Sequence, residues 1–428
     1  MVGYILRKLI YGIVVLWGVI TLVFAIFSIN PGDPARMLLG QRVDEESLAA
    51  VNRELGLDLP KGEQYLLYLN DISPISIHEN ENQESHLYLD ADKYDYTALF
   101  SVGSSTIVLK YPYLRQSFQS RKPVADIIAE ALPGTVILAL FAISFALVFG
   151  ILFGIISAVY KGSFLDNFAL FSAVLGMSTP SFFAAIIFSW LGGYLWSVQM
   201  SLPVLPFVFL LLGIAFTFFG KTKLSGFRFV SNALKGFVLG LGLTLLGGAI
   251  QFLFGINIIP FSGTAFHLPG TGLNMTGSLY DVDVFTGEYL AMQNLILPVI
   301  TLGVRPLAIV MQLTRNSLLE QFSQDYVRTA RAKGLSEGRV IFGHALRNAL
   351  NPVVTAISGW FASMLAGAVF IEFIFNWKGL GLQVFQSLQN DDYPVVMGSV
   401  LVIAAAFVLI NILVDVIYGV LDPRIRLK

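Results

Sequence analysis

The sequence of 428 residues contains no cysteine. This absence excludes disulfides, thiol catalysis and cysteine-ligated metals, but it does not indicate a compartment. Charge is also scarce: charged residues make up 13% of the chain, whereas soluble proteins carry about 25%. The positive and negative side chains nearly cancel, so nothing indicates a nucleic-acid partner. With 55% hydrophobic residues and a mean hydropathy of +0.72, the chain is expected to be a membrane protein with several spans.

Two catalytic signatures of membrane hydrolases are missing too. The chain has no His-Glu-x-x-His sequence and no paired aspartates within its apolar runs. It also lacks the phosphate-binding pattern Gly-x-x-x-x-Gly-Lys-Ser/Thr. If ATP drives this protein, the ATP must therefore be bound by another chain.

Long apolar runs predict an all-α membrane bundle of about eight spans, because each run is long enough to cross roughly 30 Å of hydrocarbon. The runs lie at about 9–29, 134–160, 166–195, 202–219, 236–255, 293–313, 353–375 and 395–418. The first run follows Arg7 and Lys8, but it is too long for a signal peptide and has no small-residue cleavage site. We interpret it as an uncleaved anchor. Within the third run, Ser178-Thr179-Pro180-Ser181 is expected to kink the helix.

The distribution of Lys and Arg predicts that both termini are cytoplasmic. Basic residues occur in the N-terminal end, in three predicted inside loops and in the C-terminal end: Arg7, Lys8, Lys161, Lys221, Lys223, Arg228, Lys235, the stretch 315–347, Arg424, Arg426 and Lys428. The predicted outside stretch 256–290 has neither Lys nor Arg. An even number of spans agrees with this pattern.

The polar stretch 31–132 is expected to lie outside the membrane. Its apolar residues at Leu48, Val51 and Leu55 have helical spacing, which predicts a short helix over 45–55. His78 and His86 stand in an acidic patch, for which we expect a solvated loop; a metal site is the alternative, although the spacing matches no standard site.

The cytoplasmic stretch 315–351 is too polar to enter the membrane, yet it is patterned for helices. Leu319, Phe322, Tyr326 and Ala330 predict an amphipathic helix that continues from the preceding span. Gly334 then suits a left-handed turn, and Ser336 can begin a second helix.

The second helix is expected to place Phe342, Leu346 and Leu350 on one side and to end before Asn351-Pro352. A rigid pair of short helices that is joined to a membrane helix at each end moves together with those helices, so it transmits their motion well. An ordinary basic loop is the alternative.

The sequence of this loop resembles a family. Asp325-Tyr326-Val327-Arg328-Thr329-Ala330-Arg331-Ala332-Lys333-Gly334-Leu335 and His344-Ala345-Leu346-Arg347-Asn348-Ala349-Leu350-Asn351-Pro352 look like the EAA loop of ABC importer permeases of the dipeptide/oligopeptide/nickel class. The resemblance extends to Gly379-Leu380-Gly381, Asp392-Tyr393-Pro394 and, near the N-terminus, Pro31-Gly32-Asp33-Pro34-Ala35. The large polar segment after the first span is similar to that of the first permease of the pair.

Two departures concern the general EAA pattern, which has Glu and Pro where this chain has Arg328 and Arg347. Two segments, 70–110 and 198–255, have no counterpart in the six-span pattern, and we interpret them as an external insertion and an added helical hairpin.

The expected organisation is 1–30 (N-terminal end and first span), 31–132 (external segment), 133–197 (second and third spans), 198–255 (hairpin), 256–290 (external loop) and 291–428 (core spans with the coupling loop 315–351).

The resemblance implies a permease of the bacterial inner membrane that is not an enzyme and holds no cofactor or metal, since ATP and Mg would be bound by partner ATPases. It implies a heterodimer with a second permease, two cytoplasmic ATP-binding subunits, an external substrate-binding protein, a surrounding lipid bilayer and no nucleic acid. The pair would form the pathway for peptides. The residues expected to couple to an ATPase are Tyr326, Arg328, Thr329, Ala330, Arg331, Lys333, Gly334, Leu335 and Arg339.

Charged residues within apolar runs are costly and often functional. Arg305 and Glu372 are therefore possible pathway or gate residues, with structural pairing or an interfacial position as the alternatives. Asp415 is expected to pair structurally with a basic residue of the loop.

Three rival functions remain at this point. An ABC permease for nickel or another small solute would share the same motifs. A secondary transporter would need coupling acids and often internal repeats, which the sequence does not clearly contain. A membrane-embedded hydrolase would need an unusual catalytic site.

Overall fold

The computed structural model describes residues 2–29, 44–54, 56–80, 82, 85–91, 93–198, 200–219, 226–254, 265–283 and 287–421. The chain divides into two compact units, Met1–Ala139 with Ser358–Lys428 and Leu140–Ile357, and each is described by itself. The predicted motif Pro31 to Ala35 lies outside the described residues, as do Lys221, Lys223, Arg424, Arg426 and Lys428 and the side chains of Arg228 and Asp415.

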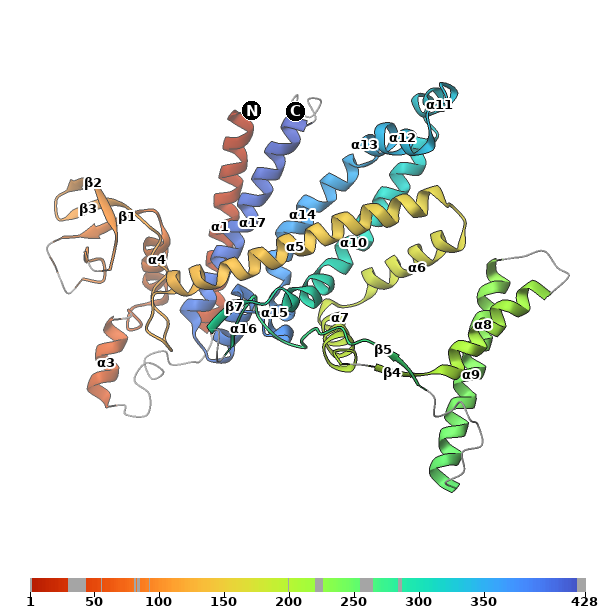
Figure 1. The fold of residues 1–428 in the computed structure, drawn as a ribbon. Helices are drawn as coiled ribbons and strands as arrows, with labels where there is room; N and C mark the ends of the chain where they lie inside the picture. Colours follow the sequence, from red (N-terminus) through yellow and green to blue (C-terminus); the bar gives the residue numbers. More distant parts are fainter. Residues whose placement is uncertain are drawn as a thin grey trace. The chain divides into compact units, whose positions relative to one another are not determined.

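In the first unit, the two terminal apolar helices lie side by side. Helix α1 (Val2–Ile29) packs on α17 (Tyr393–Leu421), and the two run antiparallel, so their chain ends lie at the same end of the pair (Figure 1). The packing is tight where Gly12 faces Val408, because a Cβ on Gly12 would overlap the Val408 side chain. Both helices expose apolar side chains along much of their length, as expected for surfaces that lie in lipid.

The polar segment after α1 folds into helices and a small sheet. Helix α3 (Glu45–Glu54) confirms the helix predicted over 45–55, and α4 (Lys61–Ile72) follows it. Strands β1 (Ile75–Glu79), β2 (Tyr96–Val102) and β3 (Ser105–Lys110) form an antiparallel sheet in the order β1-β3-β2. The expected solvated loop is therefore wrong at His78, which lies in β1 with 1% of its surface exposed.

The alternation of exposed and buried positions in β1 explains why His78 is buried. Ser76 and His78 point to the covered face of the sheet, where the Ser76 hydroxyl contacts His78 Nε2 and the His78 ring packs on Tyr94. Burial lowers the pKa of His78, with the Lys110 cation as a further cause. Among the described residues, no cluster of three or more ligating side chains could hold a metal ion.

A network of buried polar groups joins α4, the sheet and the chain that follows it. The Asp71 carboxylate accepts hydrogen bonds from the Tyr94 hydroxyl (2.9 Å) and from Arg115 Nε (3.2 Å). Lys110 Nζ donates to the Asp71 carbonyl at 2.7 Å. Burial lowers the pKa of Lys110 to about 8, while burial and the Asp71 charge raise the pKa of Tyr94.

The remaining helices of the first unit are shorter. Helix α15 (Val369–Phe375) ends at Asn376 in a left-handed conformation and packs on α16 (Leu380–Gln389), which in turn packs on α17. Helices α5 (Val124–Val159) and α14 (Asn351–Gly367) each belong partly to both units. A cluster of Val124, Ile128, Leu380 and Val395 forms the apolar core here.

In the second unit, the long helix α10 (Gln293–Phe322) packs against α6 (Phe164–Ser178) and α7 (Ser181–Phe188). A π-helical stretch, η1 (Ser189–Leu195), continues from α7. The chain bends by 111° between α6 and α7–η1, at Thr179-Pro180. This bend confirms the predicted kink, since Pro180 has no backbone N–H to continue the helix.

Helices α8 (Val204–Phe219) and α9 (Gly226–Phe254) pack closely along one another. The close approach depends on glycine: a Cβ on Gly213 or Gly236 would overlap a backbone carbonyl of the facing helix. Short strands flank this hairpin, with β4 (Met200–Pro203) paired to β5 (Ala265–Leu268) and, further along, β6 (Tyr280–Asp283) paired to β7 (Gly287–Leu290).

Among the described residues, five helices are long and apolar enough to cross a membrane, and six if the bent pair α6 and α7–η1 counts as one span. The five are Leu6–Ile29, Val124–Val159, Ser231–Leu253, Gln293–Phe322 and Tyr393–Val414. The count is lower than the eight predicted from apolar runs. The run 353–375 is divided at Ala368 into α14 and α15, and Val204–Ile214 in α8 is a shorter apolar helix.

Candidate functional site

The candidate coupling loop is a chain of short helices after α10. Helix α11 (Asp325–Ala332) is followed by α12 (Glu337–Val340), a π-helical turn η2 (Ile341–Ala345) and α13 (Leu346–Ala349). Helix α10 does continue from the apolar run into the loop, but it does not reach Ala330 as predicted. Helix α10 ends at Phe322, the Ser323 side chain bonds back to the Glu320 carbonyl, and Gln324 adopts an extended backbone.

The loop has its own apolar core, which contains the predicted Ala330 and has Leu319, Phe322 and Leu346 packed against it. Two of the predicted positions, Tyr326 and Phe342, are not part of it. Val327 is fully buried, whereas Tyr326 is 38% exposed. In the second half, Phe342 points outward and the adjacent Ile341 is buried instead. The core consists of Ile155, Ala158, Leu318, Val327, Ala330, Val340, Ile341, Ala345 and Ala349. The helices are short and broken, so a single helical period could not predict which positions face inward.

The exposed surface of the loop is basic and carries most of the predicted coupling residues. Tyr326, Arg328, Thr329, Arg331, Lys333, Gly334 and Arg339 are exposed, while Leu335 is half-buried and Ala330 is buried. Arg331 forms two hydrogen bonds with the Glu337 carboxylate (3.0 and 3.2 Å), which ties α11 to α12. The Tyr326 hydroxyl donates to Gln321 and accepts from Asn348, so this side chain bridges α10 and α13.

The turn between α11 and α12 depends on Gly334. Its φ is +77°, a left-handed conformation that glycine adopts without steric cost, as predicted. The Gly334 N–H donates to the Arg331 carbonyl at 2.9 Å, and Ser336 precedes the first residue of α12. Residues 334–338 also match the pattern Gly-x-Ser-x-Gly, but here the pattern follows a helix rather than a strand. It therefore does not form the nucleophile turn of a hydrolase.

Behind the loop, a buried ion pair joins three helices. Arg315 near the end of α10 donates through Nε to Asp166 Oδ1 (2.7 Å) and through its terminal nitrogen to Oδ2 (2.9 Å). The Ser157 hydroxyl of α5 and the Gly162 N–H also donate to this carboxylate. Asp166 is not among the residues predicted from the sequence. Its only local signal was an acid in the first turn of a helix that begins after Ser163.

The two possible pathway residues have different surroundings within their own units. Arg305 is exposed on α10, directly before Pro306. Glu372 on α15 is fully buried. Its carboxylate accepts hydrogen bonds from the Thr135 hydroxyl (2.7 Å) and the Leu382 N–H (3.0 Å), an arrangement that holds the first turn of α16.

Two family models match the chain. "Binding-protein-dependent transport system inner membrane component" matches residues 150–427, and its N-terminal companion, "Binding-prot-dependent transport system membrane comp, N-term", matches residues 1–84. The dipeptide transport system permease protein DppB of Escherichia coli (strain K12) is 33% identical over 430 residues, covering 100% of each chain. The di/tripeptide transport system permease protein DppB of Pseudomonas aeruginosa is 31% identical over 428 residues, covering 100% of this chain and 99% of its own.

Proposed function

The chain belongs to the family of binding-protein-dependent transport system inner membrane components, and from this we propose that it forms half of a pathway through which peptides enter the cell. It is a permease subunit of an ABC importer and not itself an enzyme. What we propose beyond this is that its substrate is a peptide. The dipeptide and di/tripeptide permeases that resemble this chain along its full length support it.

We infer that the chain pairs with a second permease, that each of two ATP-binding subunits docks on one permease, and that an external binding protein delivers the substrate. The surface of α11 and α12 supports the docking role. Its buried core makes it one rigid body, and its exposed basic side chains offer contacts to an acidic groove. Closure of the ATPases on ATP would then move the loop together with α10, to which Tyr326 ties it.

The antiparallel pair α1 and α17 supports a topology in which both termini are cytoplasmic. Charge supports the same orientation, because Arg7 is exposed at the beginning of α1. In this arrangement the polar segment between α1 and α5 lies outside and faces the binding protein.

Gentle purification of the tagged full-length chain, with mass spectrometry of what accompanies it, tests the assembly. We expect a second permease and ATP-binding subunits, and ATP hydrolysis that rises when a peptide-loaded binding protein is added. A chain that purifies alone and transports with an ion gradient would contradict the proposal. Stimulation by a nickel complex and not by peptide would retain the importer and change its substrate.

A further inference from the structure

The apolar run 353–375 is interrupted, because the chain breaks at Ala368 and the short helices α15 and α16 follow before α17 begins. Helix α15 packs on α16, and α16 packs on α17. A broken helix in an apolar run is tolerated where protein covers it or where it lines a water-filled cavity. In secondary transporters, discontinuous helices of this kind form the substrate site. The pair α15 and α16 therefore has the construction of a part that lies beside the pathway.

A buried acidic side chain joins this pair to a third helix. Glu372 on α15 is fully buried, and both of its carboxylate oxygens accept hydrogen bonds. The Thr135 hydroxyl of α5 donates to one oxygen (2.7 Å), and the Leu382 N–H of α16 donates to the other (3.0 Å). Thr135 in turn accepts a hydrogen bond from the Leu380 N–H (2.7 Å). One carboxylate and one hydroxyl thus connect α5, α15 and α16.

Glycines allow the chain to approach this carboxylate closely. A Cβ on Gly379 would lie 2.5 Å from Glu372 Oε2, and a Cβ on Gly381 would lie 2.9 Å from the same atom. A Cβ on Gly134 of α5 would overlap the Lys378 carbonyl. Because the carboxylate accepts a hydrogen bond from the first turn of α16, the positive end of the helix dipole also stabilises its charge. The surroundings are therefore built for an acidic side chain at this position.

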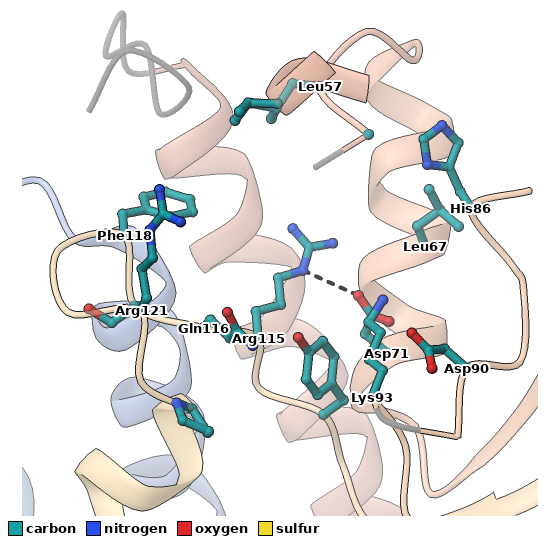
Figure 2. A pocket seen from close by; sticks show the side chains of 15 residues that line it. Leu57, Leu67, Asp71, His86, Asp90, Lys93, Arg115, Gln116, Phe118 and Arg121 are labelled. Carbon is teal, nitrogen blue, oxygen red and sulfur yellow. Dashed lines mark hydrogen bonds and ion pairs between the residues drawn. The ribbon is translucent and has the colours of Figure 1, made fainter. Parts of the chain in front are cut away.

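The other end of α16 is fastened to the same part of the chain. Asp392, which follows α16, accepts hydrogen bonds from the Ser117 hydroxyl and from the Phe118 N–H (2.9 Å). Both donors belong to the loop that leads into α5, and this loop also lines a cavity of about 690 Å³ in the polar segment. Figure 2 shows the loop around Phe118 and Arg121 beside this cavity. Helix α16 is thus held at both ends by carboxylates that bond to α5 or to the loop before it.

From the interrupted run, the buried carboxylate and the glycines around it we propose that α15 and α16 form a gate of the pathway and that Glu372 is its positioning residue. The inference rests on the topology proposed above, in which α17 ends in the cytoplasm, so that α16 lies at the outer end of the pathway. Glu372 is fully buried and does not touch the substrate. It fixes α15 against α16 and joins both to α5, so the three move as one body during transport.

Glu372→Gln tests the carboxylate at nearly constant volume. The amide nitrogen of glutamine must face either the Leu382 N–H or the Thr135 hydroxyl, so one donor loses its acceptor. We expect the backbone amides at the start of α16 to exchange at least about tenfold faster in hydrogen-exchange mass spectrometry of the purified full-length chain in nanodiscs. Thr135→Val should have the same effect, because it keeps the shape and lacks the hydroxyl. Thr135→Ser keeps the hydroxyl and should retain slow exchange.

A second measurement separates positioning from stability. In the transporter assembled with its partner subunits, Glu372→Gln and Thr135→Val should raise ATP hydrolysis without substrate or binding protein at least about threefold. A loosened gate opens at lower cost, so the ATP-binding subunits can close without a substrate. A variant that is only less stable would lower hydrolysis instead. The assay uses no substrate, so its result does not depend on the peptide assignment.

Glu130→Gln is the matched control, because Glu130 is an exposed acid on α5, and it should behave like the wild type in both measurements. Unchanged exchange at α16 in Glu372→Gln and Thr135→Val overturns the proposal, and so does fast exchange in Thr135→Ser. Faster exchange with unchanged or lower hydrolysis also overturns it, since Glu372 would then only stabilise the fold. The exchange measurement uses this chain alone, so failure of the proposed assembly is distinguishable from failure of this inference.

Discussion

The proposed coupling loop 315–351 and the polar segment 44–123 are both rich in charge, but their charged side chains are placed in opposite ways. In the part of the loop beyond α10, apolar side chains fill the core and the charged groups stay outside: Asp325 is 97% exposed and its partner Arg328 is 71% exposed. In the polar segment, Asp71, Lys110 and Tyr94 bond to one another in the interior. Exposed charges cost little to rearrange and suit a docking surface, whereas buried ones fix a shape and suit a pocket.

The largest effect is expected in the loop, from Gly334→Val. A β-branched residue strains the left-handed turn, so the angle between α11 and α12 should change and ATP-driven uptake should fall by at least about tenfold. Uptake into proteoliposomes with the partner subunits measures this. Gly338→Val is the control, because Gly338 is exposed and is not among the glycines with positive φ. Unchanged uptake by Gly334→Val would refute the coupling assignment.

The next effect concerns the buried ion pair between Asp166 and Arg315, and it tests whether this pair stabilises the helices that carry the loop. Asp166→Asn leaves Arg315 without its counter-charge, and we expect a loss of roughly 3 kcal/mol in stability. Thermal unfolding in detergent reports this loss. The exposed pair provides the contrast: Asp325→Asn should change stability by less than about 0.5 kcal/mol. Equal shifts for both variants would mean that the burial of Asp166 does not matter.

A smaller effect concerns the docking surface alone. Arg328→Glu reverses an exposed charge and should leave stability almost unchanged, while affinity for the ATP-binding subunits falls about tenfold. Binding of purified ATP-binding subunits to the immobilised permease measures it. Arg347→Glu makes the same change at an exposed position outside the predicted contact set. If both reversals weaken binding equally, the surface acts through net charge and not through α11.

The smallest effect is the pH dependence of the polar segment. The pKa of Lys110 is lowered to about 8 in the fold, so between pH 8 and 10.5 the unfolded state binds more protons than the folded one. Stability from this group must therefore rise with pH through that window. The raised pKa of Tyr94 acts in the opposite direction above pH 10.

Limited proteolysis of the segment at pH 7 to 10 can follow this rise. Lys110→Met should remove the rise, since the variant has no group to titrate there. Lys122→Met, which removes an exposed lysine from the following loop, should keep it. A pH profile that is the same in wild type and Lys110→Met would show that this buried amine is not the cause.

Local patterns in the sequence predicted the features that have local causes. Pro180 predicts the bend between α6 and α7, and the structure has a 111° bend there. Gly334 predicts a left-handed turn, and its φ is +77°. In both cases the constraint lies in a single residue's backbone chemistry, so no knowledge of distant neighbours is needed.

Periodicity was less reliable where helices are short. It extended α10 through Ser323 and assigned Tyr326 and Phe342 to the buried side, although Val327 and Ile341 are the buried positions. It also counted the run 353–375 as one span, whereas the chain breaks at Ala368. Hydrophobicity shows that a segment is apolar, but not where a helix stops when side chains bond back to its last carbonyls.

The sequence by itself determined the membrane character, the helical class and the family, because composition and short motifs encode them. Tertiary structure decided the rest. Asp166 pairs with an arginine 149 residues away, and Ser117 bonds to a carboxylate 275 residues away. The Asp71 carboxylate accepts hydrogen bonds from Tyr94 and Arg115, although many other donors occur in the sequence. These pairings depend on which segments pack together, since a charge is stabilised in the interior only where the fold supplies its partner.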